Sequence, residues 1–199
     1  MAHIDYYFAV NSPFTYLAGT RMEEVAAKHG ASLDYYPLDI MALFARTGGT
    51  PPKERHPARL ELRAQELRRM SKKTGLAMDL DPPFRASNGA PASYAFIAAQ
   101  KAGGGDLGKL VAAFTGAVWR DTRDIAEDAV IAECLSEAGF DPALASSGML
   151  EGAEVYTSNL EKAVNAGVFG APFYIVDGTE KIWGQDRIED LDLYLAGKL

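Results

Sequence analysis

Asn11-Ser12-Pro13-Phe14-Thr15-Tyr16-Leu17, near the start of a 199-residue chain, is the segment from which the rest of the fold can be inferred. Ser12 stands where a helix N-cap is expected, and Pro13 stands at the first helical position. Apolar residues then follow at helical spacing and predict a helix as far as His29. The preceding residues, 4–10, are rich in aromatic and β-branched side chains and predict a buried strand. The chain therefore opens with a strand that places the Ser12 hydroxyl at the start of a helix, where it is a helix cap or a functional group.

Beyond this first pair, the periodicity divides the chain into strands at its two ends and helices between them. Residues 32–38 predict a second strand, and residues 172–176 and 180–184 predict two more, joined by a tight turn. A last helix is predicted from Gln185 or Asp186 through Leu195. The patterns between the strands are helical and mostly end at glycine. They predict helices over 41–46, 58–73, 90–102, 125–138 and 149–166, and a helix that Asp106 can cap and that runs to Trp119 or Arg120.

Without the helical block, the elements follow the order βαβ and then ββα, which is the order of a thioredoxin fold. We therefore predict an α/β protein with a thioredoxin-like fold and a large all-helical insertion between its two halves. The thioredoxin-like domain would be discontinuous, with residues 1–40 and 166–199, and the inserted helical domain would span residues 41–165.

Composition and charge exclude several classes of function. The net charge of −7 argues against nucleic-acid binding, and the basic cluster 63–73 is interpreted as a solvated helix face. No apolar run approaches the roughly 20 residues that span a bilayer, and no signal-type segment is seen, so a cytoplasmic protein is expected. Cys134 is the only cysteine, which rules out an internal disulfide, a CxxC pair and a thiolate zinc cluster. We expect a packed, inert thiol and no bound metal.

The segment Val168-Phe169-Gly170-Ala171-Pro172 is the second feature of interest. A proline that opens a strand after a glycine-containing loop is a candidate for a cis peptide bond, although an ordinary trans proline fits the position too. A bend there would leave the backbone of Ala171 unpaired and facing the Ser12 helix. An extended peptide ligand could then pair with Ala171 as an added β-bridge.

The third feature is Trp183-Gly184-Gln185-Asp186-Arg187, where a strand ends and a helix begins. Backbone amides at such a junction are free to bind a carboxylate, and Asp186 can bind an ammonium group. Asp186 can equally be the N-cap of the last helix, and the two roles are compatible.

Taken together in this order, the three motifs resemble those of the 2-hydroxychromene-2-carboxylate isomerases, which are grouped with the kappa-class glutathione transferases and are related to the bacterial disulfide oxidoreductases. The resemblance extends over essentially the whole chain. It implies that glutathione is the cofactor and that a homodimer forms. It also implies that Ser12 contacts the glutathione sulfur, that Ala171 pairs beside cis-Pro172, and that the γ-glutamyl end is held by Trp183, Gly184, Gln185 and Asp186.

The chemistry of these residue types agrees with that implication. A hydroxyl donor at a helix start stabilises a thiolate, whereas no neighbouring base is present to turn Ser12 into a nucleophile. The candidates for binding the carboxylate of a substrate are Arg55, Arg85 and Asn88, each of which can instead be a surface or loop-structuring residue. Members of the family often carry a lysine and an asparagine after the second strand, where this chain has Phe44-Ala45-Arg46 and Gly48-Gly49. This departure bears on the identity of the substrate more than on the binding of glutathione.

The resulting prediction is a glutathione-dependent isomerase that acts on 2-hydroxychromene-2-carboxylate or a related unsaturated aromatic acid in aromatic-compound catabolism. Two alternatives remain open at this point. One is a kappa-like transferase that conjugates glutathione to electrophiles, and the other is a non-enzymatic thioredoxin-fold binding protein. Dithiol–disulfide exchange is excluded because Ser12 occupies the place of the first reactive cysteine.

Overall fold

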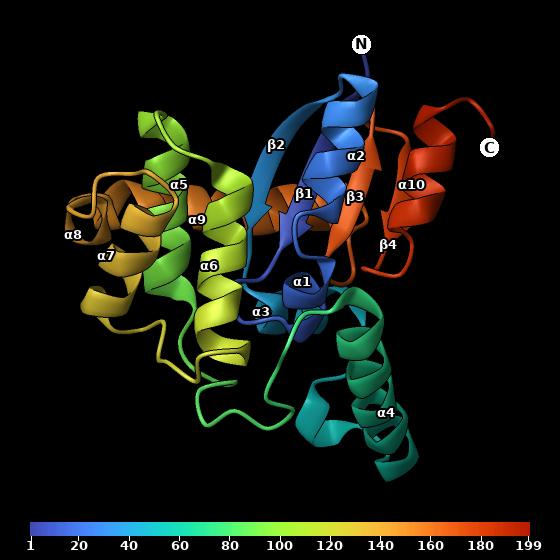
Figure 1. Ribbon diagram of the computed structural model, residues 1–199, viewed down its shortest axis with the longest axis horizontal. Coiled ribbons are helices and arrows are strands. Elements are labelled where there is room, and N and C mark those ends of the chain that lie inside the picture. The colour runs from blue at the N-terminus through green and yellow to red at the C-terminus, as the bar shows by residue number, and fades with distance from the viewer.

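The computed structural model describes residues 1–199 and consists of a four-stranded mixed sheet with helices on both faces (Figure 1). The order of the strands in the sheet is β2-β1-β3-β4. The strands are β1 (His3–Phe8), β2 (Ser32–Pro37), β3 (Phe173–Val176) and β4 (Glu180–Trp183). The central strands are β1 and β3, although more than 160 residues separate them in the chain.

Strand directions bring three distant segments to one end of this sheet. β1 is parallel to β2 and antiparallel to β3, with Tyr7 opposite Phe173, and β3 is antiparallel to β4, with Phe173 opposite Trp183. The end of β1, the start of β3 and the end of β4 therefore lie at the same edge. The segments that contain Ser12, Pro172 and Asp186 all leave the sheet there.

Helices account for most of the remaining chain. In Figure 1, α1 lies at the lower end of the sheet, α4 projects below it, and α9 crosses behind the strands. No helix has both the length and the apolar character needed to cross a membrane. The helices are α1 (Pro13–Ala18), α2 (Arg21–His29), α3 (Ile40–Thr47), α4 (Pro57–Thr74), α5 (Ala90–Ala102), α6 (Leu107–Trp119), α7 (Asp128–Glu137), α8 (Leu144–Ser147), α9 (Met149–Asn165) and α10 (Ile188–Leu195), with a 3₁₀ turn at Pro52–Glu54.

The main hydrophobic core runs from the sheet into the helices. Alternate residues of β1, including Tyr6 and Phe8, face this core and pack with Phe96 of α5 and Phe114 of α6. A smaller cluster on the other face of the sheet contains Tyr7 and residues from α3 and α9. The two predicted parts of the chain thus share one core, and their division at residues 41 and 165 stays a prediction.

The predicted helix from Pro13 to His29 is wrong, because the structure has two helices there. Gly19 adopts φ 58° and ψ −137°, a conformation open only to glycine, and its N–H bonds to the carbonyl of Tyr16. The chain changes direction at this residue, and α2 begins at Arg21. Continuous apolar periodicity on both sides of Gly19 concealed the break. As a result, α1 has only six residues.

Two other predicted helix starts are wrong by about three residues. The last helix begins at Ile188, because Gly184 has φ 106° and the N–H of Arg187 bonds back to its carbonyl in a turn. The helix predicted from residue 125 begins at Asp128, after a turn in which Asp124 accepts the N–H of Ala126. In both places a local turn competes with the helix for the same residues.

Candidate functional site

Ser12 is the N-cap residue of α1, as the sequence predicts. Its backbone is extended, with φ −80° and ψ 127°, and its Oγ accepts the N–H of Thr15 at 3.3 Å. The Ser12 N–H bonds in turn to the carbonyl of Ala9 at 3.0 Å. The side chain is half-buried, and the hydroxyl hydrogen is directed to no acceptor in the protein. Ser12 can therefore cap the helix with its lone pairs and still donate a hydrogen bond to a ligand.

Asn11 holds Ser12 in place, a role that the sequence analysis did not predict. The indole Nε1–H of Trp119, at the end of α6, donates to the carbonyl of Asn11 at 3.1 Å. The side-chain amide of Asn11 donates to the carbonyl of Ser87 at 3.2 Å. These bonds join the residue before Ser12 to α6 and to the loop before α5. Because both partners are distant in the chain, no local pattern could reveal them.

The predicted cis peptide bond is present between Ala171 and Pro172. Strand β3 begins only at Phe173, and neither the N–H nor the carbonyl of Ala171 takes part in a backbone hydrogen bond. Ala171 is half-buried, whereas Pro172 is buried and its carbonyl accepts the N–H of Gly184 at 3.0 Å. The unpaired backbone predicted for Ala171 is thus confirmed, at the edge of the sheet where Ser12 also lies.

The segment after β4 presents some of its predicted groups and turns others inward. The Trp183 ring is 53% exposed and packs edge-on against Phe169, with ring centroids 4.9 Å apart. Gln185 is buried, and its side-chain oxygen accepts a hydrogen bond from Arg21 at 3.0 Å. The Gly184 N–H is already bonded to Pro172, as described above. Of the predicted γ-glutamyl groups, the Trp183 ring and the Asp186 carboxylate are those that face solvent.

Asp186 is not the N-cap of the last helix, so that alternative interpretation is wrong. The cap position of α10 is Arg187, and no side chain bonds there. The Asp186 carboxylate instead folds back over Gly184, where an added Cβ would lie 2.5 Å from Asp186 Oδ1. Only glycine fits at position 184, and Asp186 forms no ion pair with another side chain. Its carboxylate is available for a cation.

Arg21 connects this segment to the end of α1. Its guanidinium donates to the carbonyls of Leu17 at 2.8 Å and Ala18 at 3.2 Å, and to the carbonyl of Gln185 at 3.0 Å. A cation at the last carbonyls of a helix is favourable. Arg21 thereby fixes the 183–186 segment relative to Ser12, and the sequence offered no signal for it.

The three predicted substrate-binding residues lie in loops near α1, and each is partly engaged. Arg55 donates from Nε to the carbonyl of Thr50 at 2.8 Å. Arg85 pairs with Asp81 at 2.8 Å, and the Asn88 side-chain oxygen accepts the N–H of Ala90 at 3.1 Å. All three therefore structure their loops, in agreement with the alternative interpretation of these residues. The Arg55 and Arg85 guanidinium groups keep further donors free.

Arg63 of α4 is a further cationic residue, in addition to Arg55 and Arg85, that the sequence did not single out. The interpretation of residues 63–73 as a solvated face is wrong for Arg63, which is half-buried with its Cζ 5.5 Å from the centroid of the Phe14 ring. Burial lowers its pKa below the usual value for arginine, and the charges of Arg55 and Arg85 lower it further. A surplus of positive charge thus lies beside the first turn of α1.

The lone cysteine is remote from this site. Cys134 is buried in α7, and burial raises the pKa of its thiol to about 12. A thiol with this pKa is not ionised at neutral pH and cannot serve as a nucleophile. The prediction of a packed, inert cysteine is confirmed.

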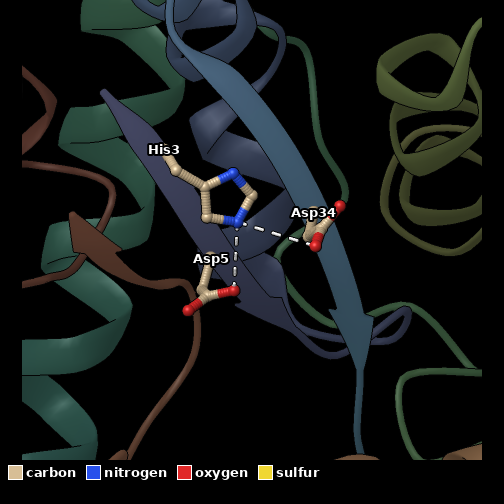
Figure 2. Close-up of side chains that lie close together, drawn as sticks. All are labelled: His3, Asp5 and Asp34. Atoms are coloured by element: carbon tan, nitrogen blue, oxygen red, sulfur yellow. Dashed lines mark ion pairs between the residues drawn. The ribbon is translucent and has the colours of Figure 1, made fainter. Parts of the chain in front are cut away.

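A second group of ligand-type side chains lies near the opposite end of the sheet (Figure 2). His3 Nε2 is 3.5 Å from Asp5 Oδ1 and 3.6 Å from Asp34 Oδ2, and Ser32 Oγ contacts the other ring nitrogen at 2.8 Å. The ammonium group of Lys162 is 3.6 Å from the same oxygen of Asp5. This cation already balances the carboxylate, so we describe the group as a surface ion-pair network and assign it no metal.

Comparison with known proteins gives concordant results. The family model described as a DSBA-like thioredoxin domain matches residues 3–196. The 2-hydroxychromene-2-carboxylate isomerase of Sphingobium xenophagum is 28% identical over 195 residues, covering 96% of this chain and 97% of that protein. The isomerase of the same name from Pseudomonas sp. strain C18 is 26% identical over 202 residues, covering 98% and 90%.

Solved structures show the same fold. A selenomethionine 2-hydroxychromene-2-carboxylate isomerase superposes with a TM-score of 0.79 at 23% identity, covering 98% of this chain and 95% of the other. The cytosolic disulfide reductase DsbM from Pseudomonas aeruginosa gives 0.70 at 16% identity, with 98% of both chains covered. The predicted thioredoxin-like fold with a helical insertion is confirmed.

Proposed function

Because this chain belongs to the DSBA-like thioredoxin domain family, and because it is similar to proteins named 2-hydroxychromene-2-carboxylate isomerase, we propose that it is a glutathione-dependent isomerase of an unsaturated aromatic acid in aromatic-compound catabolism. The observation that carries the proposal is the meeting of a free hydroxyl donor, Ser12, with an unpaired peptide backbone, Ala171, at one edge of the sheet. A thiol-containing tripeptide could bind its sulfur to the hydroxyl and its backbone to the unpaired peptide group.

Glutathione fits this edge by its functional groups. Its cysteinyl residue would pair with the N–H and carbonyl of Ala171 as an added strand, which places its sulfur toward Ser12. The ammonium group of the γ-glutamyl end would pair with the free carboxylate of Asp186, beside the exposed ring of Trp183. No base neighbours Ser12, so its role is to stabilise the thiolate.

The energetic demand on Ser12 is modest. A thiol with a reference pKa of about 8.5 is only about 3% ionised at pH 7. Lowering that pKa by about two units requires roughly 2.7 kcal/mol of preferential interaction with the anion. Because α1 has only six residues, its dipole supplies less than a long helix would. The Ser12 hydroxyl carries the larger share in this proposal.

The reaction would be an addition followed by its reversal. The thiolate adds to the β-carbon of the unsaturated keto acid, and the electron pair of the double bond moves to the keto oxygen as an enolate. The carbon–carbon bond, now single, rotates. The enolate then re-forms the ketone and expels the thiolate, so glutathione is regenerated and the net change is isomerisation.

Calorimetric titration with glutathione and with S-methylglutathione tests the proposal. In the titration, we expect wild-type protein to prefer the free thiol and Ser12→Ala to lose that preference. In a rate assay, Ser12→Ala should lose about 100-fold in kcat/KM, the equivalent of the 2.7 kcal/mol above. Ser158→Ala, an exposed serine on α9, is the matched control and should behave as wild type. Absence of glutathione binding to wild-type protein would contradict the proposal.

Product analysis separates the isomerase from the two other candidates. Unchanged glutathione with converted acid supports the isomerase, whereas stoichiometric loss of glutathione identifies a kappa-like transferase. The departure at Gly48-Gly49 and the preceding Phe44–Arg46 segment, where the family often has asparagine and lysine, makes this assay necessary. A biological activity that survives in Ser12→Ala would point to a non-enzymatic binding protein. The homodimer implied by the resemblance remains a prediction, which size-exclusion chromatography tests.

A further inference from the structure

Arg63 carries a charge that the protein leaves unbalanced. Its guanidinium is half-buried, yet no carboxylate lies within ion-pair distance and no protein oxygen accepts its hydrogen bonds. Glu66, on the same helix, only weakly offsets the effect of burial. A half-buried charge has lost part of its hydration, and an anionic ligand can replace the lost interaction.

The position of Arg63 relates this charge to the candidate site. Its Cζ lies 5.5 Å from the centroid of the Phe14 ring, and Phe14 is two residues after Ser12 in the first turn of α1. In Figure 1, α4 lies below and to the right of α1, at the lower end of the sheet. Arg63 therefore lies against the first turn of α1, which Ser12 caps, whereas Ala171 and Asp186 belong to the β3 and β4 side of the same edge.

The positive charges of the neighbouring arginines favour an anionic ligand over a neutral one. Arg85 is already paired with Asp81, and Arg55 is held by Thr50 and lies 5.7 Å from the centroid of the Phe44 ring. Both nevertheless add their charge at Arg63, as its lowered pKa reflects. Among these three arginines, Arg63 is thus the one whose N–H donors are all free. The planar fork of N–H donors in a guanidinium group matches the two oxygens of a carboxylate in geometry.

We propose that Arg63 is the specificity-determining residue that binds the carboxylate of the acid substrate beside Ser12. This inference rests on the proposed function and adds to it a residue on α4. In an unsaturated α-keto acid, the carboxylate carbon is three bonds from the carbon that receives the sulfur. A carboxylate on Arg63 would hold the reacting carbon near the sulfur of a glutathione bound at Ser12.

Binding of benzylidenepyruvate and of its uncharged methyl ester, measured by calorimetry on the full-length protein, tests Arg63. We expect wild-type protein to prefer the acid, and Arg63→Gln to weaken binding of the acid roughly 10- to 100-fold while leaving the ester within about twofold. Arg63→Lys should recover part of the difference, since it keeps the charge and loses the fork. Arg68→Gln, an exposed arginine on the same helix, is the matched control.

The possible outcomes separate this inference from the function on which it rests. Equal weakening of acid and ester in Arg63→Gln, or an unchanged preference for the acid, overturns the role of Arg63 even if glutathione binds normally. Loss of glutathione affinity in Arg63→Gln also overturns it, because the guanidinium would then serve the cofactor. If wild-type protein prefers the acid but binds no glutathione, the result supports the anion site at Arg63 and contradicts the glutathione-dependent function. Thermal unfolding of each variant establishes that the fold is intact.

Discussion

Glu23 is a carboxyl group that the fold holds among aromatic side chains. Tyr35 donates to its Oε1 at 3.3 Å, while Oε2 is buried without a partner. Burial raises the pKa of Glu23 to about 7. An unfolded chain has an ordinary glutamate pKa near 4.3. The folded protein therefore keeps this proton over a range of pH in which the unfolded protein has lost it.

We predict that this difference makes stability fall as pH rises from about 4.5 to 7, because the folded state binds the extra proton there. Glu23→Gln should remove that dependence and be about 1–2 kcal/mol more stable than wild type at pH 8. The full shift corresponds to roughly 4 kcal/mol, of which a buried amide retains part as desolvation cost. Urea unfolding at pH 5 and pH 8 measures the effect.

Glu24→Gln, at the exposed neighbouring position, is the control and should not reproduce the gain at pH 8. If Glu23→Gln has the same stability as wild type at both pH values, the carboxyl group is not buried as described.

Single residues of the candidate site were predictable where a backbone rule applied to them. Ser12 followed from helix capping, and the cis bond at Pro172 with the unpaired Ala171 followed from a proline that opens a strand. Arg63 and Asn11 did not follow, because their roles depend on partners more than 45 residues away. Sequence periodicity records which face of a helix is apolar, and an arginine that lies over an aromatic ring has no signature in it.

Among the elements, the first helix shows how one residue can divide a continuous pattern. Apolar spacing runs unbroken from α1 into α2, yet Gly19 turns the chain with φ 58° and ψ −137°. An added Cβ at Gly19 would approach the Leu76 side chain to 3.3 Å. The turn brings Arg21 back to the last carbonyls of α1 and to Gln185. The break therefore positions the site, and periodicity alone could not reveal it.

We predict that Gly19→Ala destabilises the protein by about 2–3 kcal/mol, since an L-residue is strained in that conformation. Gly30→Ala is the matched comparison, because Gly30 also ends a helix with positive φ but has ψ 27° and no atom within 4 Å of an added Cβ. Its cost should be only about 1 kcal/mol, the ordinary penalty of the left-handed region. Urea unfolding of both variants measures the difference. Equal costs at the two positions would contradict this account of the break.

Across the whole molecule, α9 is the element that joins the helical part to the sheet. It packs closely on α5, where Gly152 faces Tyr94, and further along Asn159 donates to the carbonyl of Pro37 at 3.1 Å. The thioredoxin-like order of the elements along the chain and the helical insertion were predictable from the sequence pattern. The common core was not predictable, because it depends on which faces of the helices pack together. Close contacts between helices, such as that of Gly152 with Tyr94, determine those faces.

We predict that Gly152→Ala destabilises the protein by about 1–3 kcal/mol through overpacking. The added Cβ would lie 2.6 Å from the Cβ of Tyr94 and 2.7 Å from its Cα, so backbone as well as side chain must move. Helix propensity alone would favour alanine by about 1 kcal/mol, so the sign of the change tells which effect dominates. Denaturant unfolding followed by far-ultraviolet circular dichroism and by tryptophan fluorescence should give coincident transitions, as expected for one core. Separate transitions would show two independently folding parts.

Both ends of the chain lie away from the edge that holds Ser12. Strand β1 runs from His3 toward that edge, and α10 runs from Ile188 away from it, so Met1 and Leu199 lie at the opposite end of the sheet (Figure 1). A tether at either terminus would therefore leave the Ser12 edge turned toward the bulk solution. The protein could be immobilised on a sensor chip through its N- or C-terminus, and small thiols or acids could then be passed over it without steric interference from the anchor.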